Sequence, residues 1–381
     1  MPVHDAPLAP LQSIELREIR LPLKEPFVAS HGTVHDKRIL LLKLTDADGT
    51  HAWSECVALA DPSYLPETLD TCWLALCEWV GPRALGLDSA SPRGVHQALT
   101  ASVRGHAMAR AAVEMGCWTL AAERRGASLS TLLGGTRPEV ATGLAIGIEL
   151  DRDRLATKVR TAIAEGYRRL KLKIRPGWDV EPLRTARRVA GEGFDLIADA
   201  NSAYRLEDAE HLARFDAFGL SMIEQPLGWE DLSQHAELQR QLATPICLDE
   251  SITSLARAAD MVALGSGQIL NLKPGRVGGF SESLAIHQLC RKHGIALWCG
   301  GMLESGIGRA YNVALASLPG FTLPGDLSPS QRYWERDVVT PEWTMSAAGR
   351  VAVPEASGLG VEVDRDRIED LTVRRHRLTG D

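Results

Sequence analysis

Residues 169–201 read RLKLKIRPGWDVEPLRTARRVAGEGFDLIADAN, and this stretch decides the fold. Two short apolar runs, at 169–174 and 195–200, flank an amphipathic stretch with the spacing of a helix. Runs of this length and composition are typical of strands that are buried on both faces. A strand, a helix and a second strand in this order predict one β/α unit of a parallel sheet.

The same alternation continues along the chain on both sides of this stretch. Further short apolar runs, often flanked by Gly or Pro, lie at 143–150, 221–224, 246–248, 268–272 and 296–299, with a weaker run at 321–323. Seven or eight such units within about 190 residues favour a closed parallel barrel over an open doubly wound sheet. We therefore predict the α/β class and a TIM-like barrel.

The chain before residue 126 has a different organisation. Residues 13–60 carry strand patterns with a turn signal at 46–49, and residues 65–125 are helical. Strands followed by helices predict an α+β capping domain. We place this domain at 1–125 and the barrel at 126–335. The Pro- and Gly-punctuated segment 336–381 is expected to return to the cap.

Composition excludes several classes of function. The chain has 42 Lys and Arg against 49 Asp and Glu, a net charge of −7, which disfavours binding to nucleic acid. No apolar run reaches the roughly 20 residues that span a bilayer, and residues 1–12 lack signal-peptide features. The seven cysteines form no CxxC pair, which is typical of free thiols in a reducing compartment. We expect a soluble cytoplasmic protein that binds neither nucleic acid nor membrane.

Five ionisable residues recur with the period of the β/α unit, each at the carboxyl end of a predicted strand. They are Lys173, Asp199, Glu224, Asp249 and Lys273, and the successive separations are 26, 25, 25 and 24 residues. Barrel enzymes build their active sites at this end of the strands. One such residue alone would indicate an ordinary ion pair, but the period across five strands favours a shared site.

The three carboxylates of this series come from three adjacent predicted strands. Charged groups in apolar surroundings are costly to bury unless they neutralise one another or bind an ion. Carboxylate oxygens suit Mg²⁺, which keeps coordination positions for water or substrate. We predict that Asp199, Glu224 and Asp249 bind Mg²⁺, or another divalent ion such as Mn²⁺ or Co²⁺.

The two lysines of the series lie before and after the carboxylates in the chain. In a barrel, strands two and six lie on roughly opposite sides, so a metal-bound substrate carboxylate would sit between Lys173 and Lys273. Lys171 points to the same face of its strand as Lys173, and its charge should lower the pKa of Lys173 toward that of a base near neutral pH.

Two neighbours of the carboxylates have expected roles of their own. Asn201 lies two residues beyond Asp199, on the same side, and is expected to hydrogen-bond a lysine or a ligand carboxylate. Glu250 follows Asp249 and would point the other way along a regular strand. We expect Glu250 to contact the metal ligands rather than the metal.

Five short motifs resemble, in their order, the muconate lactonising subgroup of the enolase superfamily. They are Lys-x-Lys (171–173), Asp-x-Asn (199–201), Glu-Gln-Pro (224–226), Asp-Glu-Ser (249–251) and Lys-Pro-Gly (273–275). The resemblance spans about residues 26–361 and implies a (β/α)7β barrel with an α+β cap. It also implies the same three metal ligands, with Lys173 and Lys273 as paired acid/base catalysts, as is known for lysine bases in this superfamily.

Longer segments resemble one branch, the N-acylamino acid racemase and o-succinylbenzoate synthase group. They lie at 105–110, 172–180, 273–279, 298–306 and 323–326. The resemblance implies a racemase that transfers a proton at one carbon (1,1-proton transfer) through an ene-diolate, with o-succinylbenzoate synthase activity that would belong to menaquinone biosynthesis. Arg276 resembles the racemase members in particular. A small-molecule carboxylate substrate and a homo-oligomer, from dimer to octamer, are implied as well.

Substrate contacts are expected from the strand ends, the cap loops and the last barrel loops. The expected residues are Lys171, Asn201, Arg276, Gly301, Met302, Leu303, Phe27, Leu59, Asp326 and Tyr333. Leu59 and Ala145 stand where methionine and serine are common in the group, which leaves the exact substrate open. Two alternatives remain: another lyase or cycloisomerase of the muconate subgroup, and a non-catalytic homologue that keeps the fold.

Overall fold

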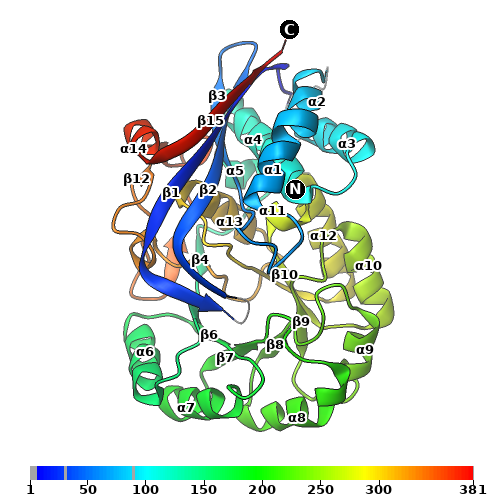
Figure 1. Cartoon of the computed structure of the whole chain (residues 1–381), viewed down its shortest axis with the longest axis vertical. Helices are drawn as coiled ribbons and strands as arrows, with labels where there is room; N and C mark the ends of the chain where they lie inside the picture. The colour runs from blue at the N-terminus through cyan, green and yellow to red at the C-terminus, as the bar shows by residue number, and fades with distance from the viewer. Residues whose placement is uncertain (1–6, 30–31, 88–90, 381) are drawn as a thin grey trace.

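The structure, a computed structural model, describes residues 7–29, 32–87 and 91–380. The capping domain is built on an antiparallel sheet with the strand order β15-β1-β2-β3. The first strands are long, and their hairpin reaches from the cap to the barrel (Figure 1). The strands are β1 (Leu11–Ala29), β2 (Gly32–Asp46), β3 (His51–Cys56) and β15 (Thr372–Thr379).

Helices pack against this sheet, as the patterns at 65–125 predicted. The long α4 is buried from Met108 to Ala122, except at Arg110, and ends at Gly126, whose φ of 60° is the left-handed conformation of a helix C-cap. Gly116 lets α4 approach β2 closely, because a Cβ there would lie 2.7 Å from Leu44 Cδ1. The helices are α1 (Leu69–Ala75) with a π-helical continuation η1 (Leu76–Val80), α2 (Gly81–Leu85), α3 (Pro92–Ser102), α4 (Ala107–Arg125) and α5 (Leu129–Leu133).

The barrel strands are parallel and follow one another in space as they do in the chain, in the order β11-β10-β9-β8-β7-β6-β5. All are short and almost wholly buried, as expected for strands covered on both faces. They are β5 (Leu144–Ile146), β6 (Arg169–Lys173), β7 (Asp195–Asp199), β8 (Met222–Glu224), β9 (Ile246–Leu248), β10 (Ile269–Leu272) and β11 (Ala296–Cys299).

A final segment, residues 321–326, closes the barrel between β11 and β5. On one side Asp326 N donates to Cys299 O at 2.9 Å, and on the other Gly143 N donates to Gly325 O at 2.7 Å. This segment is the weak run predicted at 321–323, and it pairs through isolated bridges instead of a continuous strand. The α/β class and the (β/α)7β TIM-like barrel with its cap are therefore confirmed.

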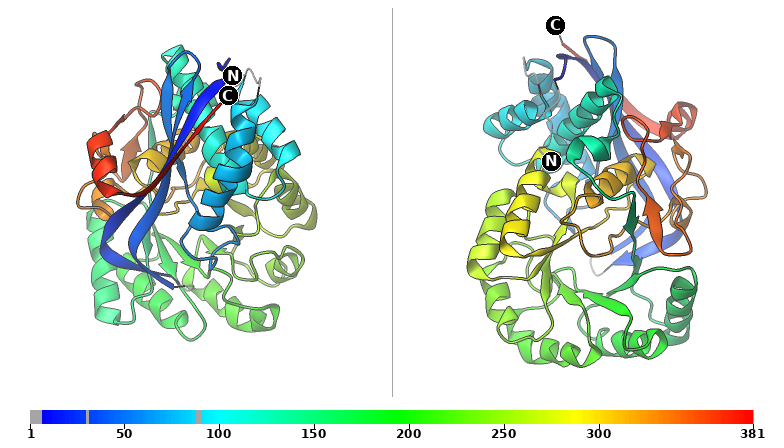
Figure 2. Two further views of the ribbon diagram at one scale, coloured as in Figure 1. Left: turned by 45° about the horizontal axis from the view of Figure 1, so that its top comes forward. Right: turned by 180° about the vertical axis from the view of Figure 1, so that it is seen from behind.

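Helices cover the outside of the barrel strands (Figure 2). Several begin at a side-chain cap; Asp151, for example, accepts hydrogen bonds from the backbone of Asp153 and Arg154. The helices are α6 (Arg152–Ala164), α7 (Val180–Ala190), η2 (Leu206–Asp208), α8 (Ala209–Ala213), η3 (Arg214–Phe218), α9 (Ser233–Gln239), α10 (Leu255–Leu264), α11 (Pro274–Val277), α12 (Phe280–His293) and α13 (Gly306–Ala316).

The chain after the barrel runs back along its side to the cap. β13 pairs with β4 beside the barrel, and β15 pairs with β1 in the capping sheet. The elements are β4 (Glu139–Ala141), η4 (Ser330–Arg332), β12 (Val339–Thr340), β13 (Arg350–Ala352), β14 (Glu362–Val363) and α14 (Arg365–Leu371). Among the described residues, no helix combines the length and the apolar character needed to cross a membrane.

Candidate active site

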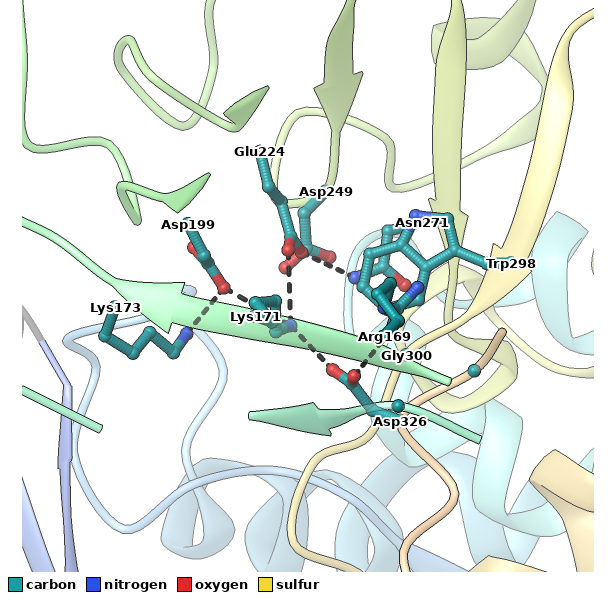
Figure 3. Close-up of polar contacts among 12 residues, drawn as sticks. Arg169, Lys171, Lys173, Asp199, Glu224, Asp249, Asn271, Trp298, Gly300 and Asp326 are labelled. Atoms are coloured by element: carbon teal, nitrogen blue, oxygen red, sulfur yellow. Dashed lines mark hydrogen bonds and ion pairs between the residues drawn. The ribbon is translucent and has the colours of Figure 1, made fainter. Parts of the chain in front are cut away.

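The side chains at the carboxyl ends of the barrel strands gather on the side that faces the cap. β6 ends at Lys173, β7 at Asp199 and β8 at Glu224, and the parallel register places each of them beside the next. Asp249 and Lys273 directly follow β9 and β10. The period seen in the sequence therefore corresponds to residues that lie at one end of the barrel. Figure 3 labels four of them, Lys173, Asp199, Glu224 and Asp249.

Lys173 is held by residues of the barrel. Its Nζ donates to Asp199 Oδ2 at 2.7 Å and to Asn201 Oδ1 at 2.6 Å. Asn201, which was expected to contact a lysine or a ligand, donates in turn to Glu250 Oε1 at 3.0 Å. Burial, reinforced by the nearby Asp199, raises the pKa of Glu250 to about 7.

Lys273 is held by both domains. Its Nζ lies 2.9 Å from Asp249 Oδ2 and donates to Tyr64 OH at 2.9 Å. Tyr64 belongs to the cap segment between β3 and α1, and the centre of its ring lies 4.7 Å from the same Nζ. Burial alone would lower the pKa of Lys273, but Tyr64 and nearby carboxylates outweigh burial and raise it above its ordinary value.

Lys171 lies at the centre of the cluster (Figure 3). Its Nζ is 2.6 Å from Asp326 Oδ2, 3.2 Å from Glu224 Oε2 and 3.3 Å from Asp199 Oδ2. Burial alone would lower the pKa of Lys171, but these carboxylates, with Asp326 first, raise it above its ordinary value. Lys171 is therefore a cation at neutral pH. Its effect on the pKa of Lys173 stays a prediction.

The predicted metal ligands each lie against a cation in this structure. Asp199 contacts Lys171 and Lys173, Glu224 contacts Lys171, and Asp249 contacts Lys273. In this arrangement, the described part of the chain has no group of three Asp, Glu, His or Cys side chains placed to hold an ion. A metal would therefore require these carboxylates to turn from the lysines toward one another.

The donor set nevertheless fits a divalent cation. Glu224 Oε2 is buried and accepts no hydrogen bond from any described residue, although Lys171 Nζ lies 3.2 Å away as an ion-pair partner. Burial, followed by the charge of Asp199, raises the pKa of Glu224. Two buried carboxylates that repel each other, one with an oxygen that accepts no hydrogen bond from a described residue, are what an added cation would stabilise.

A cavity of about 740 Å³, counted with its mouth, lies between the cap and the strand ends. Nearly all of the residues that were expected to contact the substrate line this cavity. The described lining residues are Phe27, Gly32, Val34, Leu59, Tyr64, Ala145, Lys171, Lys173, Asn201, Lys273, Gly301, Met302, Leu303, Arg309, Asp326 and Tyr333.

Arg276 was expected to contact substrate, but it is not among the described lining residues. Its buried guanidinium lies behind the cavity wall, where it contacts Asp249 and donates to Tyr64 OH at 3.1 Å. The carbonyl oxygens of Ile252 and Asn271 accept its other hydrogen bonds, at 2.9 and 2.6 Å. Arg276 therefore orients two site residues instead of facing the cavity.

Three residues of the cluster were not predicted. Asn271 Nδ2 donates to Glu224 Oε1 at 2.7 Å, and Arg169 Nη2 pairs with Asp326 Oδ1 at 2.7 Å. Both precede a site lysine by an even number of positions, so strand alternation could have indicated them. Tyr64 lies in an irregular segment, where no periodic signal exists.

Comparison with known protein families accounts for both domains of the chain. Residues 13–134 match the family described as "Mandelate racemase / muconate lactonizing enzyme, N-terminal domain". Residues 154–367 match the family described as "Enolase C-terminal domain-like". The two matches cover the first three capping strands, the capping helices and every barrel strand that carries a site lysine or carboxylate, while β15 lies beyond them.

Individual relatives cover almost the whole chain. An o-succinylbenzoate synthase of Geobacillus kaustophilus is 46% identical over 362 residues, which are 95% of this chain and 96% of that protein. An N-succinylamino acid racemase of Amycolatopsis sp is 44% identical over 365 residues, 96% of this chain and 98% of that protein. The crystal structure of an enolase-superfamily member from Listeria innocua covers 98% of this chain and 100% of its own, at 37% identity and a TM-score of 0.94.

Proposed function

Because this chain belongs to the mandelate racemase/muconate lactonizing enzyme family of the enolase superfamily, we propose that it racemises N-acylated α-amino acids. The same site would also catalyse dehydration to o-succinylbenzoate, the activity named for the relative from Geobacillus kaustophilus. Both reactions begin with removal of a proton from the carbon next to a carboxylate. The partner that this site favours is thus a small-molecule carboxylate.

The observation that carries the proposal is the position of Lys173 and Lys273 at one cavity. Going round the described barrel, β6 and β10 are separated by β7, β8 and β9 on one side. On the other side they are separated by β5, the closing segment 321–326 and β11. The two amines therefore approach a substrate from opposite sides. Racemisation needs this arrangement, because one base removes the proton and an acid on the other face returns one.

Asp199, Glu224 and Asp249 would hold a divalent ion, and Mg²⁺ is the ion that we propose, since enolase-superfamily sites use it. When bound, the ion would stabilise the negative charge that develops on the substrate carboxylate as the proton leaves. Mn²⁺ or Co²⁺ would suit the same oxygens. The support within this chain is the buried Glu224 Oε2, which accepts no hydrogen bond from a described residue, and the repulsion between Glu224 and Asp199.

The chain's own residues orient the reacting groups and shield them from water. Asn201 fixes Lys173 Nζ, and Tyr64 fixes Lys273 Nζ, each by a hydrogen bond within the cavity wall. Phe27 and Leu59 contribute apolar surface from the cap. A cavity covered in this way excludes water, which strengthens electrostatic interactions at the reacting carbon.

Deuterium exchange tests the proposal directly. The enzyme with Mg²⁺ in D₂O is expected to remove the α-proton signal of N-acetyl-L-methionine and of N-succinyl-L-methionine from the NMR spectrum, while the D-enantiomer accumulates. Excess EDTA should stop both changes. If no N-acylated amino acid exchanges its α-proton in the presence of Mg²⁺, Mn²⁺ or Co²⁺, the racemase proposal is wrong.

The assembly of the enzyme stays a prediction. The resemblance noted in the sequence implies a homo-oligomer, and exposed apolar side chains in the cap, such as Leu74 and Trp79, are compatible with one. Light scattering coupled to size exclusion would measure the subunit number. A monomer at micromolar concentration would contradict the prediction.

A further inference from the structure

Lys37 is a buried lysine that lies outside the cluster described above. It belongs to β2 of the cap, is 4% exposed, and its Nζ donates to Met302 O at 3.0 Å. Burial lowers the pKa of Lys37, while the charges of Glu55 and Glu304 oppose this effect. Because burying a cation is costly, its contact with a carbonyl of the barrel calls for an explanation.

The carbonyl that Lys37 contacts belongs to a turn in the cavity wall. Met302 and Leu303 follow β11, and both line the cavity. Leu303 has a φ of 58°, in the left-handed region that a branched residue disfavours. A turn with such a residue persists only when surrounding contacts hold it, and the hydrogen bond from Lys37 to Met302 O is one of them.

The same turn touches one of the two lysines. Met302 Sδ lies 3.6 Å from Lys273 Nζ. The contact runs from β2 through Lys37 and the backbone of Met302 to Lys273. Lys173, in contrast, receives its contacts from Asp199 and Asn201 on the other side of the barrel.

The loop continues from the Met302–Leu303 turn to the start of α13, and this far end is held by a contact that does not involve Lys37. Glu55, in β3 of the cap, accepts a hydrogen bond from Ser305 Oγ at 2.6 Å and from Gly308 N at 3.0 Å, at the start of α13. Loss of Lys37 would therefore loosen the turn at Met302 without releasing the whole loop. The effect should stay local to the side of the cavity where Lys273 lies.

We propose that Lys37 is a positioning residue for Lys273, because it holds the Met302–Leu303 turn against that ammonium group. The inference rests on the proposed racemase function and adds to it a role for the cap in only one of the two proton transfers. Removing Lys37 should impair proton transfer on the face of the substrate served by Lys273. Transfer on the face served by Lys173 should change little.

The test is the rate of α-proton exchange from each enantiomer of N-acetylmethionine, measured separately by NMR in D₂O with Mg²⁺. The enantiomer whose proton faces Lys273 is the one whose exchange the Lys273→Ala variant removes. In Lys37→Met, exchange from this enantiomer should fall about 10-fold or more, since misplacing a reacting group by the order of 1 Å can cost about 100-fold. Exchange from the other enantiomer should stay within about 2-fold of wild type.

Three further variants complete the test. Lys37→Arg keeps a buried cation and a donor and should bring the ratio of the two rates back toward wild type. In Lys37→Gln the side chain is too short to reach Met302 O, but its amide can still donate hydrogen bonds to the nearby Glu55 and Glu304. This variant should therefore show the same difference between the enantiomers if Lys37→Met does not fold. Glu114→Gln is the control, because Glu114 joins the cap to the backbone of Phe280 and Ser281 in α12. It should lower the melting temperature without changing the ratio.

Two results would overturn the inference: equal losses for both enantiomers in Lys37→Met and Lys37→Gln, or an unchanged ratio in both. Exchange by the wild-type enzyme reports on the proposed function. The ratio of rates in the variants reports on Lys37 alone.

Discussion

Lys173 and Lys273, two of the three lysines among the described residues that line the cavity, are held in different ways. Lys173 donates to Asp199 and Asn201, which both belong to the barrel. Lys273 donates to Tyr64, which the cap supplies, and lies beside Met302, which Lys37 of the cap holds. The described hydrogen-bond partners of Lys173 thus all come from the barrel. The contacts of Lys273 are all present only when the cap lies over the barrel.

This difference shows how one scaffold can divide a reaction between two domains. The barrel alone fixes one amine, and the barrel and the cap together fix the other. Movement of the cap would then affect proton transfer on one face of the substrate more than on the other.

The largest effect is expected from Glu224→Gln, which acts on both sides because Glu224 lies between the lysines. Losing one ligand charge should reduce racemisation by about 10³-fold or more, as for the removal of other groups that stabilise developing charge. The stabilisation by Mg²⁺, measured as a rise in melting temperature, should also disappear.

The metal-free form of Glu224→Gln provides the control. Burial and Asp199 raise the pKa of Glu224, so a neutral amide at this position should leave the metal-free enzyme at least as stable as wild type. A variant that still gains stability from Mg²⁺ would contradict the assignment of Glu224 as a ligand.

A smaller effect is expected from a matched pair of variants, one on each side. Tyr64→Phe removes the hydroxyl that accepts from Lys273 and donates to Asp249, and Asn201→Ala removes an acceptor of Lys173. Each should slow exchange by about 10-fold, and mainly from one enantiomer, because a lost hydrogen bond to a charged group is worth about 1.5–3 kcal/mol. The two variants should affect opposite enantiomers. If both variants slow exchange from the same enantiomer, the assignment of the two lysines to opposite faces is wrong.

The smallest effect is expected on the stability of the protein at low pH, and it concerns His287 on the outside of the barrel. His287 of α12 stacks on Phe321 of the closing segment and accepts a hydrogen bond from Gly320 N at 3.2 Å. Burial lowers the pKa of His287 to about 4. Below its ordinary pKa of about 6.5, the unfolded chain binds a proton that the folded chain binds only near pH 4.

The free energy of unfolding should therefore decrease as the pH falls from about 6.5 to about 4. Replacement of His287 by Gln, which keeps an acceptor but does not titrate, should flatten this part of the curve in urea unfolding experiments. Hydrogen exchange at low pH should increase in α12 and residues 320–326 before it increases in α7. An unchanged pH dependence in the variant would contradict this account.

The same comparison explains how much the sequence could predict. The β/α period placed Lys173, Asp199, Glu224, Asp249 and Lys273 at strand ends because that period follows from the barrel itself. The fold and the family followed from the same pattern and are confirmed. Strand lengths were overestimated where the apolar runs extend into loops, as at 143–150, where β5 covers only Leu144–Ile146.

The rest depended on contacts between distant parts of the chain. Tyr64 reaches the cavity, and Lys37 reaches the backbone of Met302 in its wall, because the cap lies over the barrel; nothing in their local sequence indicates this. Asp326 was expected at the substrate and lines the cavity, but its ion pair with Lys171 was not predicted, because the closure of the barrel was visible in the sequence only as a weak run. Arg276 follows Lys273 closely in the chain, but the carbonyls around it turn it away from the cavity.

The central claim is that Lys173 and Lys273 serve opposite faces of one substrate. The most direct test is the rate of α-deuterium incorporation from each enantiomer of N-acetylmethionine in Lys173→Ala and Lys273→Ala. In each variant, racemisation should be about 10³-fold slower. Each variant should lose exchange from one enantiomer and keep it from the other, and the enantiomer lost should differ between the two variants. Loss of the same enantiomer in both variants, or exchange of both enantiomers at wild-type rates in either one, would contradict the account.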